Sequence, residues 1–155
     1  MPSVGIIGLN GQEMARAFLR MYGGNDAYCY HITDKQPEQK LNIVVADEVT
    51  PIFDTVVTTL GSDDFLIVNA DDKTILNALK KIPKKSKLIT YGFNNRACIT
   101  ASSVTNDCVQ VCIQRGFFGL DGQEREPQEF SASTKGEQSM SVLGAAAAWV
   151  VLNTK

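Results

Sequence analysis

Short apolar runs of β type alternate with stretches of helical periodicity from Val4 to Tyr91, and this alternation constrains the fold more than any other feature. It predicts a mostly parallel sheet, because parallel strands need crossover connections that are usually helical. We expect strands at residues 4–9, 27–32, 42–46, 65–68 and 87–91. The fourth run, Phe65-Leu66-Ile67-Val68, is apolar throughout, which is typical of a central parallel strand.

Three helices are expected between these strands, each with one apolar side. Thr50 is a suitable N-cap for the second helix, with Pro51 at its first helical position. Asp71 or Asp72 caps the third helix, and Pro83 stops it. The residues expected to be buried are Met14, Ala17, Phe18 and Met21 in the first helix, Ile52, Phe53, Val56, Val57 and Leu60 in the second, and Ile75, Leu76, Leu79 and Ile82 in the third.

The pattern changes after Gly92. Apolar and polar residues alternate from about residue 97 to 133, which favours antiparallel strands, with turns expected at 119–122 and 126–127. A last helix is expected from near Gly136 to Leu152, with no charged residue after Glu137. The chain of 155 residues has the length of one domain. We predict a single α/β domain over 1–155, a Rossmann-like, mostly parallel sheet flanked by helices with a small antiparallel extension.

Charge and composition exclude several classes of function. The net charge of −2 does not favour nucleic acid or an anionic membrane as a partner. The longest apolar stretch, 142–152, is too short to span a bilayer, and Met1-Pro2-Ser3 leads directly into a strand rather than a signal peptide. We therefore expect a cytoplasmic protein with no nucleic-acid and no membrane partner.

The four cysteines, Cys29, Cys98, Cys108 and Cys112, form no C-x-x-C pair, and the single histidine, His31, completes no familiar zinc pattern. We interpret the cysteines as small core residues and expect no metal site. If residues 108–112 form a strand, Cys108 and Cys112 share one of its faces.

The segment Gly8-Leu9-Asn10-Gly11-Gln12-Glu13 joins the first strand to the first helix through a glycine turn. This arrangement directs backbone N–H groups and a helix N-terminus at a phosphate. The dinucleotide fingerprint would need glycine in place of Asn10 and Glu13. The P-loop would need Lys and Ser or Thr in place of Gln12 and Glu13. A tight turn without a ligand is the alternative interpretation.

Asn69-Ala70-Asp71-Asp72 follows the central strand. Ligands of doubly wound sheets bind at the carboxyl ends of the strands, so these side chains are candidate ligand contacts. The alternative is that Asp71 and Asp72 only cap the following helix.

The order of these motifs resembles the central domain of the Mur ligase family, which makes peptidoglycan precursors by ATP-driven amide bond formation. In that family the loop reads T-G-T-N-G-K-T-T, the middle strand ends in N-A-D-D, and a later strand reads I-T-Y-G. The last helix opens with G-x-H-N-x-x-N-A-x-A-A. Here the corresponding segments are Gly8 to Glu13, Asn69 to Asp72, Ile89 to Gly92, and Gly136 onwards into the alanines of 145–148. The resemblance covers nearly the whole chain but only one of the three ligase domains, and it implies a nucleotide-binding fold.

The departures from the family concern its catalytic groups. Gln12 replaces the lysine that contacts the β- and γ-phosphates, and Glu13 replaces the hydroxyl that holds Mg²⁺. Two unit charges ~4 Å apart interact by about 4 kcal/mol at an effective dielectric constant of 20, so this exchange opposes triphosphate binding. Gln138, Ser139 and Val142 stand at the positions of the histidine and the two asparagines. The segment before Asn69 is too short for the metal-binding glutamate and histidine segments and the modified lysine of the family. Asp47 and Glu48 are substitutes for an acidic Mg²⁺ ligand or simply a solvated strand end.

Three functions follow as hypotheses. The first is a catalytically degenerate Mur-ligase-like domain that binds a nucleotide-type ligand, ATP included, or a protein partner. The second is an ATP-dependent amide ligase subunit completed by another chain, and the third is a Rossmann-type dinucleotide binder. We expect no catalytic residue, and a homodimer or a separate ligase-domain partner on an uncovered stripe of the last helix with Trp149 and Leu152. The candidate ligand contacts are Gly8, Asn10, Gly11, Gln12, Glu13, Asn69, Asp71, Asp72 and Gln138.

Overall fold

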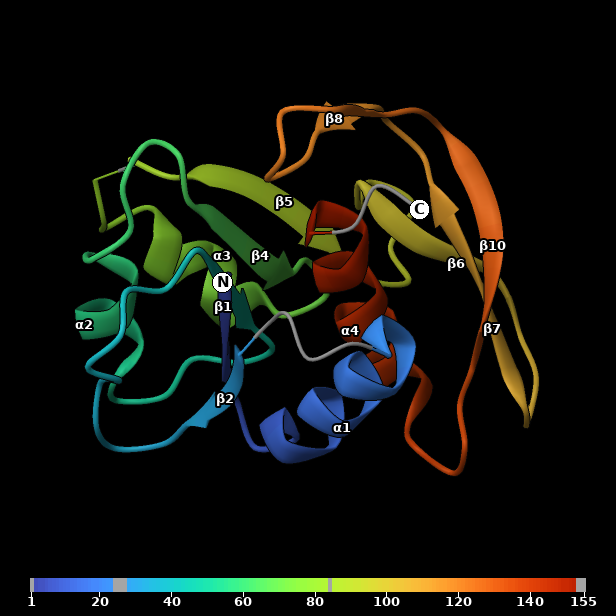
Figure 1. Ribbon diagram of the computed structural model, residues 1–155, viewed down its shortest axis with the longest axis horizontal. Coiled ribbons are helices and arrows are strands. Elements are labelled where there is room, and N and C mark those ends of the chain that lie inside the picture. The colour runs from blue at the N-terminus through green and yellow to red at the C-terminus, as the bar shows by residue number, and fades with distance from the viewer. Residues whose placement is uncertain (1, 24–27, 84, 153–155) are drawn as a thin grey trace.

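A computed structural model describes residues 2–23, 28–83 and 85–152. It confirms an α/β fold with a mixed sheet of eight strands in the order β10-β7-β6-β5-β4-β3-β1-β2 (Figure 1). A separate two-stranded ribbon pairs β8 with β9. The strands are β1 (Ser3–Ile7), β2 (Tyr28–Ile32), β3 (Ile43–Ala46), β4 (Phe65–Asn69), β5 (Lys87–Tyr91), β6 (Ile99–Val104), β7 (Cys108–Ile113), β8 (Phe117–Phe118), β9 (Glu124–Arg125) and β10 (Gln128–Ser133).

The sheet has a parallel half and an antiparallel half. Strands β1 to β5 are parallel, and β6, β7 and β10 pair antiparallel. The two halves meet between β5 and β6, where the register contains the single parallel pair Tyr91–Ile99. Beyond this junction the antiparallel strands curve away and wrap around one side of the molecule (Figure 1).

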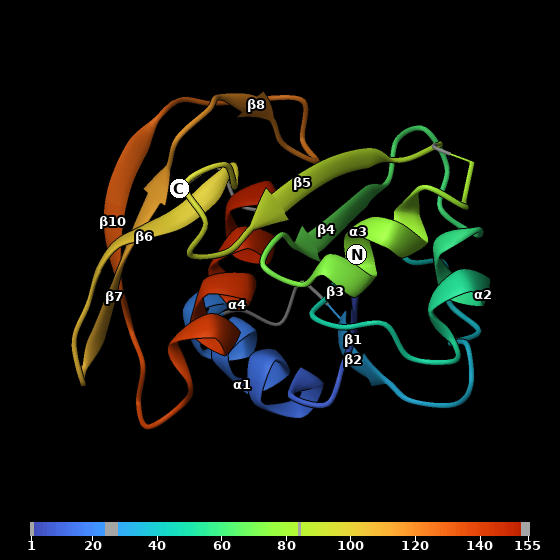
Figure 2. The ribbon, with the colours of Figure 1, turned by 180° about the vertical axis from the view of Figure 1, so that it is seen from behind.

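Two helices lie on each face of the parallel half (Figures 1 and 2). One face carries α1 (Gly11–Tyr22) and α4 (Ser139–Leu152), and the other carries α2 (Phe53–Val57) and α3 (Lys73–Leu79). Side chains alternate between the faces along each strand, so that Ile6 and Ile67 pack towards α1 and α4, whereas Ile7 and Val68 pack towards α2 and α3.

The last helix is covered along most of its length. Residues 141–148, Val150 and Val151 are buried by α1 and by strands of the sheet. Of the apolar side chains of this helix, those of Met140, Trp149 and Leu152 are half-buried, and they are what remains of the predicted uncovered stripe. The helix begins at Ser139 rather than near Gly136, because Gly136 has a φ of 83°, outside the helical region.

The two helices on the opposite face are shorter than predicted. Thr50 is not an N-cap: α2 begins only at Phe53, and the Thr50 hydroxyl is buried with no hydrogen-bond partner among the described residues. In α3 only Ile75 is fully buried, whereas Leu76 is 37% exposed. The helix ends at Leu79, before Pro83 is reached.

The cysteines correct the interpretation that all four are core residues. Cys98 is buried and Cys29 packs partly against the core. Cys108 and Cys112 do share one face of β7, as predicted, but Val109 and Val111 occupy its buried face. Cys108 and Cys112 therefore lie on the outer, half-exposed side of β7. Among the described residues, no helix has the length and apolar character that a bilayer crossing requires.

Candidate functional site at the carboxyl edge of the sheet

The loops that follow β1, β3, β4 and β5 meet at the carboxyl edge of the parallel half. Strand β1 lies between β2 and β3, so the chain passes from β1 to β2 on one side and then crosses to β3 on the other. The loops after β1 and β3 therefore lie next to each other at the point where the strand order reverses. Ligands of open α/β sheets bind at such a point. Asp47 N–H donates to the Ile7 carbonyl at 2.9 Å, which fixes the second of these loops against the first.

The glycine turn after β1 has the geometry expected of a strand-to-helix turn. Gly8 has a φ of 139°, a conformation that side chains rarely allow, and its carbonyl accepts from Gly11 N–H at 3.1 Å. The same carbonyl lies 2.9 Å from His31 Nε2. A Cβ atom on Gly11 would lie 2.3 Å from the His31 ring, so glycine is required there by close packing. Sequence reasoning considered His31 only as a metal ligand and missed this supporting role.

Carboxylates of the chain itself accept from two backbone N–H groups close to this turn. Leu9 N–H donates to the Glu48 carboxylate, which reaches over from the loop after β3. On the other side, the Glu13 carboxylate accepts from Gln138 N–H, just before α4. A bound phosphate would compete with the first carboxylate for the Leu9 amide and would be repelled by both.

A buried hydrogen-bond network lies beneath the edge. The Asp47 carboxylate accepts from Tyr91 OH at 2.8 Å and from the Asn69 amide at 3.3 Å. Burial raises the pKa of Asp47 above its ordinary value, although the hydrogen bonds from Tyr91 and Asn69 act in the opposite direction. Burial and the nearby Asp47 charge raise the pKa of Tyr91 well above its ordinary range, so the phenol stays a donor.

The two aspartates after β4 have different partners. Asp72 caps α3, because its carboxylate accepts from Thr74 N–H at 2.8 Å and Ile75 N–H at 3.4 Å. The Asp71 carboxylate accepts instead from Phe93 N–H at 2.8 Å and Asn94 N–H at 3.0 Å, which holds the loop after β5. The prediction that one of the pair caps the helix is confirmed for Asp72.

The remaining candidates contribute less to this edge. Asn10 precedes α1 but its side chain makes no capping hydrogen bond, and Gln12 is exposed. Gln138 meets the edge through its backbone N–H. Two apolar side chains protrude there, Leu9 with 83% of its surface exposed and Phe93 with 44%. Sequence reasoning did not select either of them, and their exposure is visible only in the fold.

The residues at this edge do not fit a magnesium-bound triphosphate. Among the described residues no group of three or more His, Cys, Asp or Glu side chains could hold a metal ion. Lys and Arg are absent from the loops 8–13, 47–48 and 69–72, whereas the loop after β5 contains Arg96. The lysine of the Mur ligase loop therefore has no substitute within the glycine turn itself. This turn offers a triphosphate neither the cation nor the Mg²⁺ hydroxyl of the family pattern.

Comparisons of this chain with family models and with curated proteins found no match. The resemblance to the Mur ligase central domain therefore depends on the four motifs and their order along the chain.

Proposed function

We propose that this chain is a non-catalytic, Mur-ligase-like binding domain whose carboxyl edge contacts a protein partner. One observation carries the proposal: the Glu48 carboxylate accepts from the Leu9 amide of the glycine turn. One of the amides that would receive a phosphate, that of Leu9, is thus already paired with a negative charge. Glu13, at the first turn of α1, adds a second negative charge where a P-loop has its hydroxyl.

The exposed apolar residues at the same edge favour a protein over a nucleotide. Leu9 and Phe93 belong to the loops after β1 and β5, three strands apart at this edge, and each offers a protein partner an exposed apolar side chain among polar neighbours. The family resemblance suggests a separate ligase-domain chain as the partner, and a second copy of this chain is the alternative.

A nucleotide-type ligand is the second candidate function, since the Gly8 turn and the N-terminus of α1 retain the geometry of a phosphate-binding turn. Such a ligand would have to displace Glu48. An ATP-dependent ligase subunit and a dinucleotide binder would meet the same obstacle.

Titration calorimetry with MgATP, ADP, UDP-sugars and NAD tests the ligand half of the proposal. We expect no binding to the wild type at millimolar ligand and no phosphate release above a protein-free control. The triple variant Gln12→Lys, Glu13→Thr, Glu48→Gln should bind ATP measurably, because it removes two negative charges and adds one positive charge. Glu38→Gln, an exposed glutamate away from the edge, is the matched control and should behave as wild type. Tight ATP binding by the wild type would contradict the proposal.

Light scattering at micromolar concentration tests the partner half. If the partner is a second copy, the double variant Leu9→Ser, Phe93→Ser should dissociate the dimer. Leu19→Ser is the control, because Leu19 lies on α1 and is exposed to the same degree as Phe93. This variant should leave the dimer intact. A wild-type species of 16.9 kDa would refute self-association and leave the separate ligase-domain chain as the partner to be mixed in.

A further inference from the structure

The sheet face under α2 and α3 is incompletely covered. The seven residues of α3 span roughly 10 Å at 1.5 Å per residue, whereas each five-residue strand beneath it spans roughly 17 Å. On β4, Leu66 is still covered, with 3% of its surface exposed. On β5, Lys87 and Leu88 are exposed, Leu88 over 46% of its surface.

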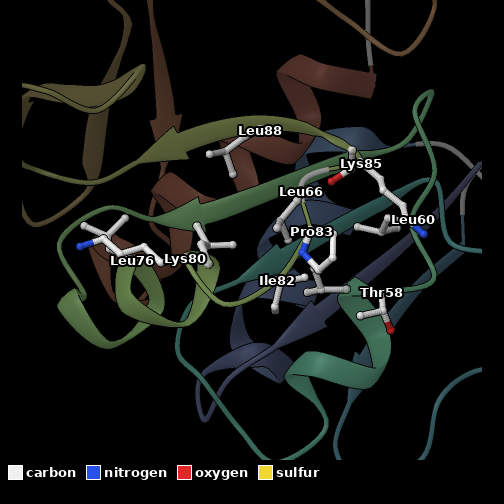
Figure 3. A pocket seen from close by; sticks show the side chains of 12 residues that line it. Thr58, Leu60, Leu66, Leu76, Lys80, Ile82, Pro83, Lys85 and Leu88 are labelled. Carbon is white, nitrogen blue, oxygen red and sulfur yellow. The ribbon is translucent and has the colours of Figure 1, made fainter.

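A cavity of about 520 Å³ occupies this uncovered region. Its volume lies within the range of about 300–1,000 Å³ that is usual for small-molecule sites. Its wall is mainly aliphatic and comes from both helices, both strands and the loop before β5. The principal apolar residues are Leu60, Leu66, Leu76, Leu79, Ile82 and Leu88 (Figure 3).

The polar groups at the cavity are few, and the charged ones are positive. Lys80 and Lys85 line it, and Figure 3 shows Leu66, Ile82 and Leu88 lying between them. Both lysines are exposed, and neither forms an ion pair with another described residue.

The charge distribution of the sequence agrees with this arrangement. The segment 73–106, which provides α3, β5 and β6, contains seven Lys or Arg residues and no Asp or Glu. The chain as a whole has a net charge of −2, so this segment is a basic region in an acidic protein. Four of these, Lys80, Lys81, Lys85 and Lys87, stand next to the cavity-lining residues Ile82, Pro83 and Ser86 in the sequence, so an anion is attracted to this end of the cavity.

We propose that the cavity between α2 and α3 binds an aliphatic carboxylate of the fatty-acid class. The hydrocarbon chain lies against the leucines, where its burial supplies most of the binding free energy. The carboxylate stays at the mouth and pairs with the lysine ammonium groups, which remain solvated. This site lies on a helix-covered face of the sheet rather than at its carboxyl edge, so it is independent of the function proposed above.

Sodium decanoate, below its micellar concentration, is the probe. Titration calorimetry measures its affinity for the full chain, and methyl NMR spectra report whether the resonances of Leu66, Leu76 and Leu88 shift. Decylamine and decanol, which have the same chain and no negative charge, are the matched ligands. We expect decanoate to bind about tenfold more tightly than either, because only decanoate pairs with the lysines.

Exposed positions give variants that keep the fold. Lys80→Glu with Lys85→Glu should weaken decanoate binding about tenfold. Leu88→Gln should weaken it about fivefold by removing part of the apolar wall. Lys73→Glu, an exposed lysine on α3 that does not line the cavity, is the matched control and should stay within about twofold of wild type.

The proposal is overturned if decanoate causes no shift at the cavity methyl groups, or if the amine and the alcohol bind as tightly as the carboxylate. It is also overturned if the Lys80→Glu, Lys85→Glu variant loses self-association rather than decanoate binding, since the occupant would then be a second copy. Each outcome is independent of the nucleotide titration.

Discussion

The two helix-covered faces of the parallel sheet differ in how completely they are closed. On one face α1 and α4, of 12 and 14 residues, cover the strands, and all of residues 141–148 are buried. On the other face α2 and α3 have only 5 and 7 residues, and Leu76 and Leu88 remain exposed over a cavity. The longer helices close one face completely, whereas the shorter ones leave Leu76 and Leu88 exposed at the margin of the other core cluster.

Small residues explain how the closed face is packed. Gly144 lies where α4 approaches α1, and a Cβ atom there would be 2.5 Å from Cε of Met14. The neighbouring alanines of 145–148 are all buried. The open face has no such close helix pair, because the helical segment after Asp72 stops at Leu79 and is followed by Lys80 and Lys81.

The largest expected effect is on the closed face. Phe18→Ala removes a fully buried ring that stacks on Tyr22, and should lower the free energy of unfolding by about 3–5 kcal/mol. Urea denaturation measures this loss. Leu19→Ala, on the same helix but 45% exposed, is the control and should cost less than about 1 kcal/mol. Equal losses for the two variants would mean that α1 is not anchored as the structure has it.

Overpacking the same face should have a smaller effect. Gly144→Val adds a branched side chain against Met14 and the Tyr91 ring, whose nearest atom lies 3.0 Å from where the new Cβ would stand. We expect a loss of about 1–3 kcal/mol in the free energy of unfolding. Thermal denaturation followed by circular dichroism detects it. If Gly144→Val is as stable as wild type, the contact between α1 and α4 is looser than described.

The buried carboxylate of Asp47, beneath the carboxyl edge of the sheet, should make stability depend on pH. Burial raises the pKa of Asp47 in the folded protein above its ordinary value of 3.8, so the folded state binds more protons than the unfolded chain between the two pKa values. The contribution of Asp47 to the free energy of unfolding is therefore most favourable at a pH below its pKa in the unfolded chain. It is lost as the pH rises through the pKa of Asp47 in the folded protein.

Asp47→Asn tests this dependence. The free energy of unfolding of the wild type, relative to Asp47→Asn, should fall as pH is raised from 4 to 7. Tyr91→Phe removes a hydrogen bond that lowers the pKa of Asp47, so it should shift the same decline to higher pH. A difference between wild type and Asp47→Asn that stays constant with pH would contradict the assignment.

The smallest effect is expected on the open face. Leu76→Ala shortens a side chain that is already 37% exposed and borders the cavity, so it should change the free energy of unfolding by less than about 1 kcal/mol. Urea denaturation of Leu76→Ala and Phe18→Ala under the same conditions compares their losses in the free energy of unfolding. A loss comparable to that of Phe18→Ala would show that this face is as tightly packed as the other.

Much of the fold could be predicted because its strands are apolar runs with clear ends. Residues 87–91 form β5 as predicted, and the other four parallel strands overlap their predicted ranges. The helix ends were predicted less well. Thr50 and Pro51 have the residue types of a helix start, yet the helix begins at Phe53, because local preference does not fix where a short helix meets the sheet.

The candidate edge could be predicted in position but not in chemistry. The motifs place Gly8, Asn69 and Asp71 at the ends of parallel strands, and the structure brings those ends together. The hydrogen-bond partner of the Glu48 carboxylate lies 39 residues away in the sequence, and that of the Glu13 carboxylate lies 125 residues away. No local sequence pattern contains contacts of such separation. The exposure of Leu88 likewise depends on how far α3 reaches over the sheet.

The packing of α4 against α1 also determines when the protein can fold during its synthesis. Residues Met14 and Phe18 leave the ribosome early, whereas their partners in 142–151 follow every strand of the sheet. Until those residues emerge, α1 alone covers that face of β1, β3 and β4. The growing chain therefore leaves part of the apolar face around Val4, Ile43 and Phe65 exposed until α4 has been made, the stage at which binding by a chaperone matters most.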